Sequence, residues 1–108
     1  MSYVTAHVLD SVLGRPASDL AVTLASADGA VIAQGRTNAD GRVPDLGPET
    51  LESGHYRITF STGDYFAARE QATFYPSVTI DFAVDAAEQH YHVPLLLSPF
   101  AFSTYRGS

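Results

Sequence analysis

The sequence has no cysteine and little positive charge, and each shortage excludes a class of protein. Without cysteine among its 108 residues, neither a disulfide nor a thiolate zinc site can stabilise the fold. Six basic residues stand against twelve acidic ones, for a net charge of −6, and they are scattered along the chain. No basic stripe exists to displace the counterions of a phosphate backbone, so we expect no nucleic-acid partner.

Long hydrophobic runs are also missing. No apolar stretch approaches the ~18 residues that a membrane span needs, so we expect no membrane partner. The first ten residues lack the charged and apolar regions of a secretory signal, and the expected localisation is therefore cytoplasmic. The composition is 45% hydrophobic and 17% charged, which is typical of a globular chain, and the length predicts a single domain over residues 1–108.

The dominant pattern is an alternation of apolar and polar residues with a period of two. It is clearest at Val78, Ile80, Phe82 and Val84, which alternate with Thr79, Asp81, Ala83 and Asp85. This alternation predicts half-buried antiparallel strands. With turn signals between them, the predicted strands are 3–10, 20–27, 31–37, 42–45, 55–61, 77–85, 89–98 and 100–106. Short strands at this spacing predict an all-β sandwich of two sheets.

One segment departs from the alternation. Residues 61–76 contain good helix formers, with Thr62 or Asp64 as a possible N-cap and Pro76 as a stop. These signals predict a short helix over 64–71.

Strand parity places several polar residues on common faces. In the 89–98 strand, His90 and His92 share a face with Pro94, opposite a core set of Tyr91, Val93, Leu95 and Leu97. In the first strand, Thr5, His7 and Leu9 lie opposite the core residues Val4, Ala6 and Val8. If the first and the last two strands share a sheet, His7 and His92 converge on its outer face, with Arg106 or Ser108. Pro94 lacks a ladder donor and predicts an edge, a bulge, or a position where the partner strand needs no hydrogen bond.

This parity gives a candidate site with more than one interpretation. Solvent-exposed histidines are ordinary, and Arg42 and His55 would also be ordinary surface residues. His90, His92 and His7 could form a three-histidine zinc site, but no carboxylate is placed to orient the ligands.

The sequence resembles a known family along nearly its whole length. "HYHVPLLLSP" (90–99) and the terminal "STYRGS" (103–108) resemble the 5-hydroxyisourate hydrolases, the transthyretin-related proteins. "TAHVLDSVLGRPASDLAVTL", "TNADGRV", "YRITFSTGDYFA" and "FYPSVTIDFAV" match the family as well. Transthyretins proper share the fold but lack the histidine pattern and this ending.

The resemblance implies a fold, an assembly and a reaction. The fold would be a transthyretin-like sandwich of two four-stranded antiparallel sheets with one short helix. The assembly would be a homotetramer, a dimer of dimers with active sites at the dimer–dimer interface. The reaction would open the ring of 5-hydroxyisourate by hydrolysis, giving 2-oxo-4-hydroxy-4-carboxy-5-ureidoimidazoline on the way from urate to allantoin. The implied catalytic residues are His7, Arg42, His92 and Ser108, and Tyr105, Arg106 and Gly107 complete the substrate-binding motif.

These residue types suit the hydrolysis of a cyclic amide without a metal or other cofactor. Histidine can move protons near neutral pH, and either His92 or His7 would be the general base. Arg42 would hold carbonyl oxygens or the oxyanion with its planar guanidinium. Ser108 offers a hydroxyl and, as the last residue, an expected α-carboxylate, and we expect the freedom of Gly107 about φ to help place it. Two alternatives remain: a transthyretin-like carrier without activity, and a zinc-dependent cyclic amidohydrolase.

Overall fold

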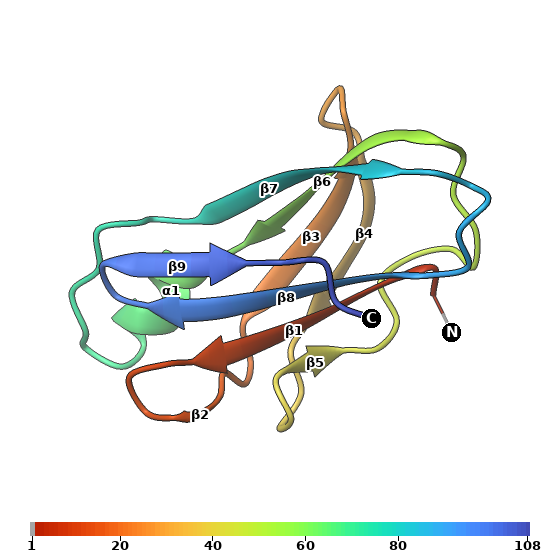
Figure 1. Ribbon diagram of the computed structural model, residues 1–108. Helices are drawn as coiled ribbons and strands as arrows, with labels where there is room; N and C mark the ends of the chain where they lie inside the picture. Colours follow the sequence, from red (N-terminus) through yellow and green to blue (C-terminus); the bar gives the residue numbers. More distant parts are fainter. Residues whose placement is uncertain (1) are drawn as a thin grey trace.

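Two β-sheets pack face to face, with one short helix at an end of the sandwich (Figure 1). The computed structural model describes residues 2–108. The elements are β1 (Val4–Asp10), β2 (Arg15–Pro16), β3 (Ala21–Ser26), β4 (Val31–Arg36), β5 (Arg42–Val43), β6 (Gly54–Phe60), α1 (Thr62–Ala67), β7 (Val78–Val84), β8 (Tyr91–Ser98) and β9 (Ala101–Thr104). The predicted all-β sandwich is confirmed.

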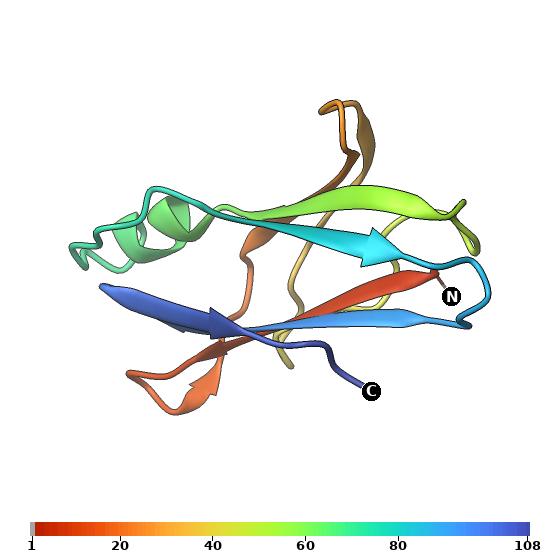
Figure 2. The same cartoon turned by 45° about the horizontal axis from the view of Figure 1, so that its top comes forward.

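The first sheet has the order β2-β1-β8-β9, with β5 also paired to β1, and the second has the order β4-β3-β6-β7. In Figure 2 the two sheets appear as separate layers, and the C-terminal segment lies on the side of the first sheet turned away from the second. The first sheet differs from the prediction in two ways. It gains the two-residue strand β2 and so has five strands in place of four, and β1 pairs with β8 in parallel. The parallel pair is possible because the whole second sheet lies between β1 and β8 in the chain and supplies the long crossover.

The core lies between the sheets and follows the predicted alternation. The residues of β1 are alternately buried and half-buried, and the outward set is Thr5, His7 and Leu9, as parity predicted. The largest fully buried side chains include Phe60, Leu20, Leu24, Ile58 and Leu95, which come from both sheets and the segment entering β3. Because the core uses one face of the first sheet, its other face is left for polar side chains.

The prediction of a helix over 64–71 is wrong at both bounds, because α1 spans Thr62–Ala67. Neither Thr62 nor Asp64 is the N-cap; that position is Ser61, whose side chain makes no capping hydrogen bond. The helix start is fixed by tertiary contacts instead. The Thr62 hydroxyl donates to the carbonyl of Tyr75 at 3.3 Å, and Gly63 N–H donates to the carbonyl of Pro76 at 3.0 Å. Within residues 2–108, no helix has the length and hydrophobicity to cross a membrane.

Candidate functional site

The outer face of the first sheet brings His7 and His92 together. In the parallel register of β1 and β8, Thr5 pairs with His92 and His7 pairs with Pro94. The two imidazole rings are 6.3 Å apart between centroids, with their planes inclined by 32°. Both side chains are half-buried. The predicted convergence of these two histidines on one face is therefore confirmed.

A tight turn before β5 delivers Arg42 to the same face. The side-chain oxygen of Asn38 accepts a hydrogen bond from Arg42 N–H at 3.0 Å, and Val8 N–H donates to the carbonyl of Gly41 at 2.7 Å. Gly41 has φ +74°, and a Cβ there would lie 2.4 Å from the carbonyl oxygen of Val8, so only glycine allows this approach. The turn sets Arg42 opposite His7 in the register of β1 and β5.

The C-terminal segment reaches the site through Gly107. Its N–H donates to the carbonyl of His92 at 2.9 Å, and the two residues form an isolated antiparallel bridge. A Cβ on Gly107 would lie 2.5 Å from Cδ2 of His92 and 3.1 Å from Cγ of Pro94. The backbone of Gly107 is not in the left-handed region, so the expected reason for this glycine, freedom about φ, is wrong. The residue is glycine because the backbone touches an imidazole ring.

Pro94 explains why this bridge stands alone. The pairing of β8 with β9 ends at Leu95 and Thr104, and the bridge between His92 and Gly107 keeps the same register. Between these pairs, Pro94 would face Tyr105 but has no N–H to donate. The carbonyl of Pro94 accepts from the Thr104 hydroxyl at 2.7 Å instead. This agrees with the prediction of a strand position where no ladder donor is needed.

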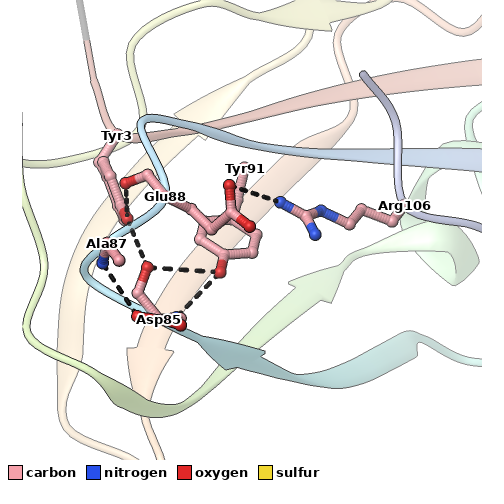
Figure 3. A network of polar contacts seen from close by, with 6 residues as sticks. All are labelled: Tyr3, Asp85, Ala87, Glu88, Tyr91 and Arg106. Carbon is pink, nitrogen blue, oxygen red and sulfur yellow. Dashed lines mark hydrogen bonds and ion pairs between the residues drawn. The ribbon is translucent and has the colours of Figure 1, made fainter.

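The side chain of Arg106 lies apart from the histidines. Because Gly107 is the residue paired with His92, Arg106 falls on the opposite face. Of the two residues predicted as alternatives to join the histidines, Ser108 therefore does so and Arg106 does not. Its guanidinium carbon lies 4.6 Å from the ring centre of Tyr91, and Nη2 is 3.8 Å from Oε2 of Glu88 (Figure 3). Tyr105 is 59% exposed.

The segment that receives Arg106 is itself held by hydrogen bonds (Figure 3). The Tyr3 hydroxyl donates to the carbonyl of Glu88 at 2.6 Å, and the Tyr91 hydroxyl accepts from Asp85 N–H at 2.8 Å. The rings of Tyr3 and Tyr91 pack edge to face, 5.7 Å apart between centroids. Arg106 therefore docks the C-terminal segment onto a structured loop.

A hollow of about 240 Å³ joins these elements. Its polar lining comes from β1, β5, β8 with the residue directly before it, and the C-terminal segment: Thr5, Arg42, His90, His92 and Ser108. Drug-sized ligands generally occupy pockets of about 300–1,000 Å³, so this hollow suits a smaller polar molecule. Hollows of about 300 and 350 Å³ lie elsewhere, but neither is lined by a histidine.

Hydrogen bonds restrict which nitrogens of the histidines can act. His7 Nε2 lies 3.0 Å from the carbonyl oxygen of Asp40. A carbonyl only accepts, so Nε2 of His7 carries the proton and Nδ1 of its neutral form has the lone pair. Nδ1 of His92 lies 2.7 Å from Oγ1 of Thr5, which leaves Nε2 as the nitrogen available to a ligand.

Burial lowers the pKa of His92, and the charges of Arg42, His7 and His90 lower it further. His92 is therefore neutral at neutral pH, the form in which an imidazole can accept a proton. Within residues 2–108 no group of three histidine, aspartate or glutamate side chains is arranged to hold a metal ion.

Sequence reasoning missed the role of Thr5. Its place on the outer face followed from parity, but its contact with His92 depends on a register between segments 87 residues apart. His55 lies on β6 of the second sheet, exposed and away from the hollow.

The fold and the hollow define a class: a small two-sheet sandwich with histidines and an arginine on the outer face of one sheet. The chain belongs to the HIUase/Transthyretin family, whose sequence profile matches residues 4–107. It is 44% identical over 115 residues to the 5-hydroxyisourate hydrolase of Caulobacter vibrioides, a match that covers 100% of both chains. The predicted family is therefore confirmed.

Two solved structures with a similar fold are proteins of different function, one a hydrolase and the other a transthyretin. The 5-hydroxyisourate hydrolase of Klebsiella pneumoniae matches with a TM-score of 0.90 and 37% identity, covering 100% of this chain and 94% of that chain. Sea bream transthyretin, in a complex with thyroxine, matches with a TM-score of 0.91 and 32% identity, covering 97% and 94%. Because the backbone matches both equally well, the side chains in the hollow must carry the functional argument.

Proposed function

We propose that this protein is an enzyme that hydrolyses 5-hydroxyisourate to 2-oxo-4-hydroxy-4-carboxy-5-ureidoimidazoline, in the degradation of urate. The observation that carries the proposal is the meeting of Arg42, His92 and Ser108 in one hollow with His7 beside it. These are the four residues that the family resemblance implied. The likeness to named hydrolases over the full chain supports the same reaction.

His92 is the proposed general base. Its lowered pKa keeps the ring neutral, and Thr5 occupies Nδ1, so Nε2 can take a proton from the attacking water. The water oxygen bonds to the ring carbonyl carbon, and the carbonyl oxygen becomes the oxyanion. A positioned acid or base of this kind contributes about 10²–10⁴-fold to the rate.

Arg42 is the proposed partner of the oxyanion, and His7, whose Nδ1 can accept a hydrogen bond, is proposed to orient the attacking water. The exposed guanidinium presents several N–H donors to a planar, oxygen-rich substrate. Loss of one oxyanion donor typically costs about 10²–10³-fold in kcat. When the carbon–nitrogen bond breaks, the leaving nitrogen takes from protonated His92 the proton that His92 removed from the water.

Ser108 is proposed to orient the substrate with its hydroxyl, and residues 105–107 carry it into place. Gly107 passes over the His92 ring, and Arg106 docks onto Tyr91 and Glu88. Their role is to position Ser108. No cofactor is required, because His92 supplies both proton transfers.

A homotetramer, arranged as a dimer of dimers with active sites at the dimer–dimer interface, is the proposed assembly. All four residues of the edge strand β9 are exposed, and Phe100 and Phe102 are 65% and 38% exposed. An exposed edge with aromatic residues is a surface that proteins commonly cover by association. Light scattering tests the tetramer. The cytoplasmic localisation stays a prediction.

The test of the reaction is an ultraviolet assay on freshly prepared 5-hydroxyisourate. Wild-type protein and the control His55→Asn, which changes an exposed histidine of the other sheet, should accelerate loss of substrate well beyond spontaneous decay. His92→Asn should lose about 10²-fold or more. Decay that is unchanged by the wild-type protein would refute the proposal and leave a carrier as the alternative.

The same assay separates the metal-dependent alternative. Activity should survive dialysis against EDTA. Loss of turnover that zinc restores would instead indicate a zinc-dependent amidohydrolase.

A further inference from the structure

The hydroxyl of Thr5 connects two imidazoles. Oγ1 lies 2.7 Å from Nδ1 of His92 and 3.0 Å from Nε2 of His90. The two rings are 6.4 Å apart between centroids and inclined by 62°, so the threonine hydroxyl supplies the contact between them. All three side chains are half-buried and line the same hollow.

A hydroxyl has one proton to donate and two lone pairs that can accept, so the three groups have three possible arrangements. In the first, Thr5 donates to His92 and accepts from His90, so neutral His92 carries its proton on Nε2 and cannot act as a base there. In the second, His92 donates its Nδ1 proton to Thr5, and Thr5 donates to the lone pair on Nε2 of His90. In the third, both histidines donate to Thr5, whose own proton then has no partner among the three groups. The second and third arrangements leave the lone pair of His92 on Nε2, and of these only the second uses the Thr5 proton.

We infer that Thr5 is a positioning residue which, with His90 as the final acceptor, holds the proton of His92 on Nδ1 and leaves Nε2 basic. The inference rests on the proposed function for its catalytic meaning, because a general base at His92 needs a lone pair on the nitrogen that faces the water. It adds two residues to the four catalytic residues implied by the family resemblance.

The charges around His92 favour this arrangement. Arg42 approaches from the β5 turn and lines the hollow beside His92. A permanent cation favours a lone pair over an N–H on a neighbouring neutral ring. The other groups that face His92 are His7 from β1, His90 just before β8, and Ser108 from the C-terminal segment. Without a carboxylate side chain among them, a hydroxyl is the group left to accept the Nδ1 proton.

The test reads the proton position directly. Long-range ¹⁵N correlation spectra of the histidine rings at about pH 8, where histidines are neutral, separate the two tautomers. In the wild-type protein His92 should show a protonated Nδ1. Thr5→Val keeps the shape but removes the hydroxyl, and should give a mixture of tautomers. Thr5→Ser restores the hydroxyl and should restore the Nδ1-protonated form.

The kinetic readout follows the same series. Thr5→Val should lower kcat about tenfold with little change in KM, the size of effect that one lost hydrogen bond has on an equilibrium, and Thr5→Ser should recover most of it. If Thr5→Val does not fold, His90→Phe tests the same pair of hydrogen bonds by removing the group that accepts from Thr5. It frees Thr5 to donate to His92 and should shift His92 toward the Nε2-protonated form.

The outcomes separate this inference from the reaction itself. A wild-type tautomer in both Thr5→Val and His90→Phe would overturn it, as would a Thr5→Ser protein as impaired as Thr5→Val. The spectra need no substrate. A wild-type protein that shows the predicted tautomer but does not turn over 5-hydroxyisourate would refute the proposed function and still confirm the role of Thr5.

Discussion

Replacing Gly107 with alanine places a methyl group where the ring of His92 already lies. The new Cβ would stand 2.5 Å from Cδ2 and 3.1 Å from Cγ of His92, and 3.1 Å from Cγ of Pro94, whereas ordinary contacts begin at 3.4 Å. The methyl and the ring must therefore separate by about 0.9 Å. His92 is held by strand β8 and by Thr5, so the C-terminal segment is the part that moves.

The displacement should damage activity far more than stability. Moving a substrate-positioning group by about 1 Å can cost about 10²-fold, and Ser108 is the next residue along the chain. The folded state loses at most the Gly107 hydrogen bond to His92, a contribution of about 0.5–1.5 kcal/mol. At about 4–8 °C per kcal/mol, the melting temperature should fall by about 2–12 °C.

Gly29→Ala is the matched control because it should show the opposite pattern. Gly29 has φ +92° and no atom within 4 Å of its virtual Cβ, so alanine meets backbone strain but no clash. Left-handed strain costs about 1–2 kcal/mol, and this turn lies between β3 and β4 of the other sheet. Turnover and circular dichroism melting should be measured on the same samples. Wild-type kcat/KM in Gly107→Ala would refute the contact between the C-terminal segment and His92.

Three further predictions concern the buried polar pair, the docking of Arg106 and the pH profile. Tyr65→Phe removes the hydrogen bond of 2.8 Å to the buried carboxylate of Asp10 and should cost about 1.5–3 kcal/mol of unfolding free energy. Burial and Asp10 raise the pKa of Tyr65 to about 12, so wild-type stability should fall as the pH rises from 10 to 12. Tyr65→Phe should reduce that decline, and the part that remains comes from groups such as Tyr3, whose pKa is also raised by burial. Arg106→Ala should lower kcat/KM with little change in melting temperature. Glu88→Gln should lower kcat/KM less, because this exposed ion pair contributes about 0–1 kcal/mol. A larger loss of kcat/KM in Glu88→Gln than in Arg106→Ala would contradict the docking of Arg106 on Tyr91. Because the pKa of His92 in the folded protein lies below 6.5, kcat/KM should stay constant as the pH falls to 6.5 and should decrease at lower pH. The free energy of unfolding should also decrease below pH 6.5, because the unfolded chain binds the proton more tightly than the folded protein does. An acid limb centred above pH 6.5 would contradict His92 as the base.

Most of the fold could be predicted because strand alternation is local. Every predicted strand has a counterpart within a few residues, and the outward set of β1 followed from the period of two alone. The helix was misjudged because its start depends on distant partners. Thr62 has the chemistry of an N-cap, but the fold uses its hydroxyl on Tyr75 and buries the side chain completely. Propensity signals near 62–71 carry no information about that contact.

The site residues show the same difference between what local sequence determines and what distant contacts determine. Parity brought His7 and His92 together because both lie inside regular strands, where side-chain direction is fixed by position. It failed for Arg106 because register, and not parity within the last segment, decides which residue faces His92. Pro94 interrupts the ladder, the pairing resumes at Gly107, and Arg106 is left on the face of Tyr91. Pro94 looked out of place in the middle of a strand, but it lies in β8 opposite the point where the C-terminal segment leaves β9. Beyond that point Gly107 crosses the ring of His92, and Ser108 reaches the hollow.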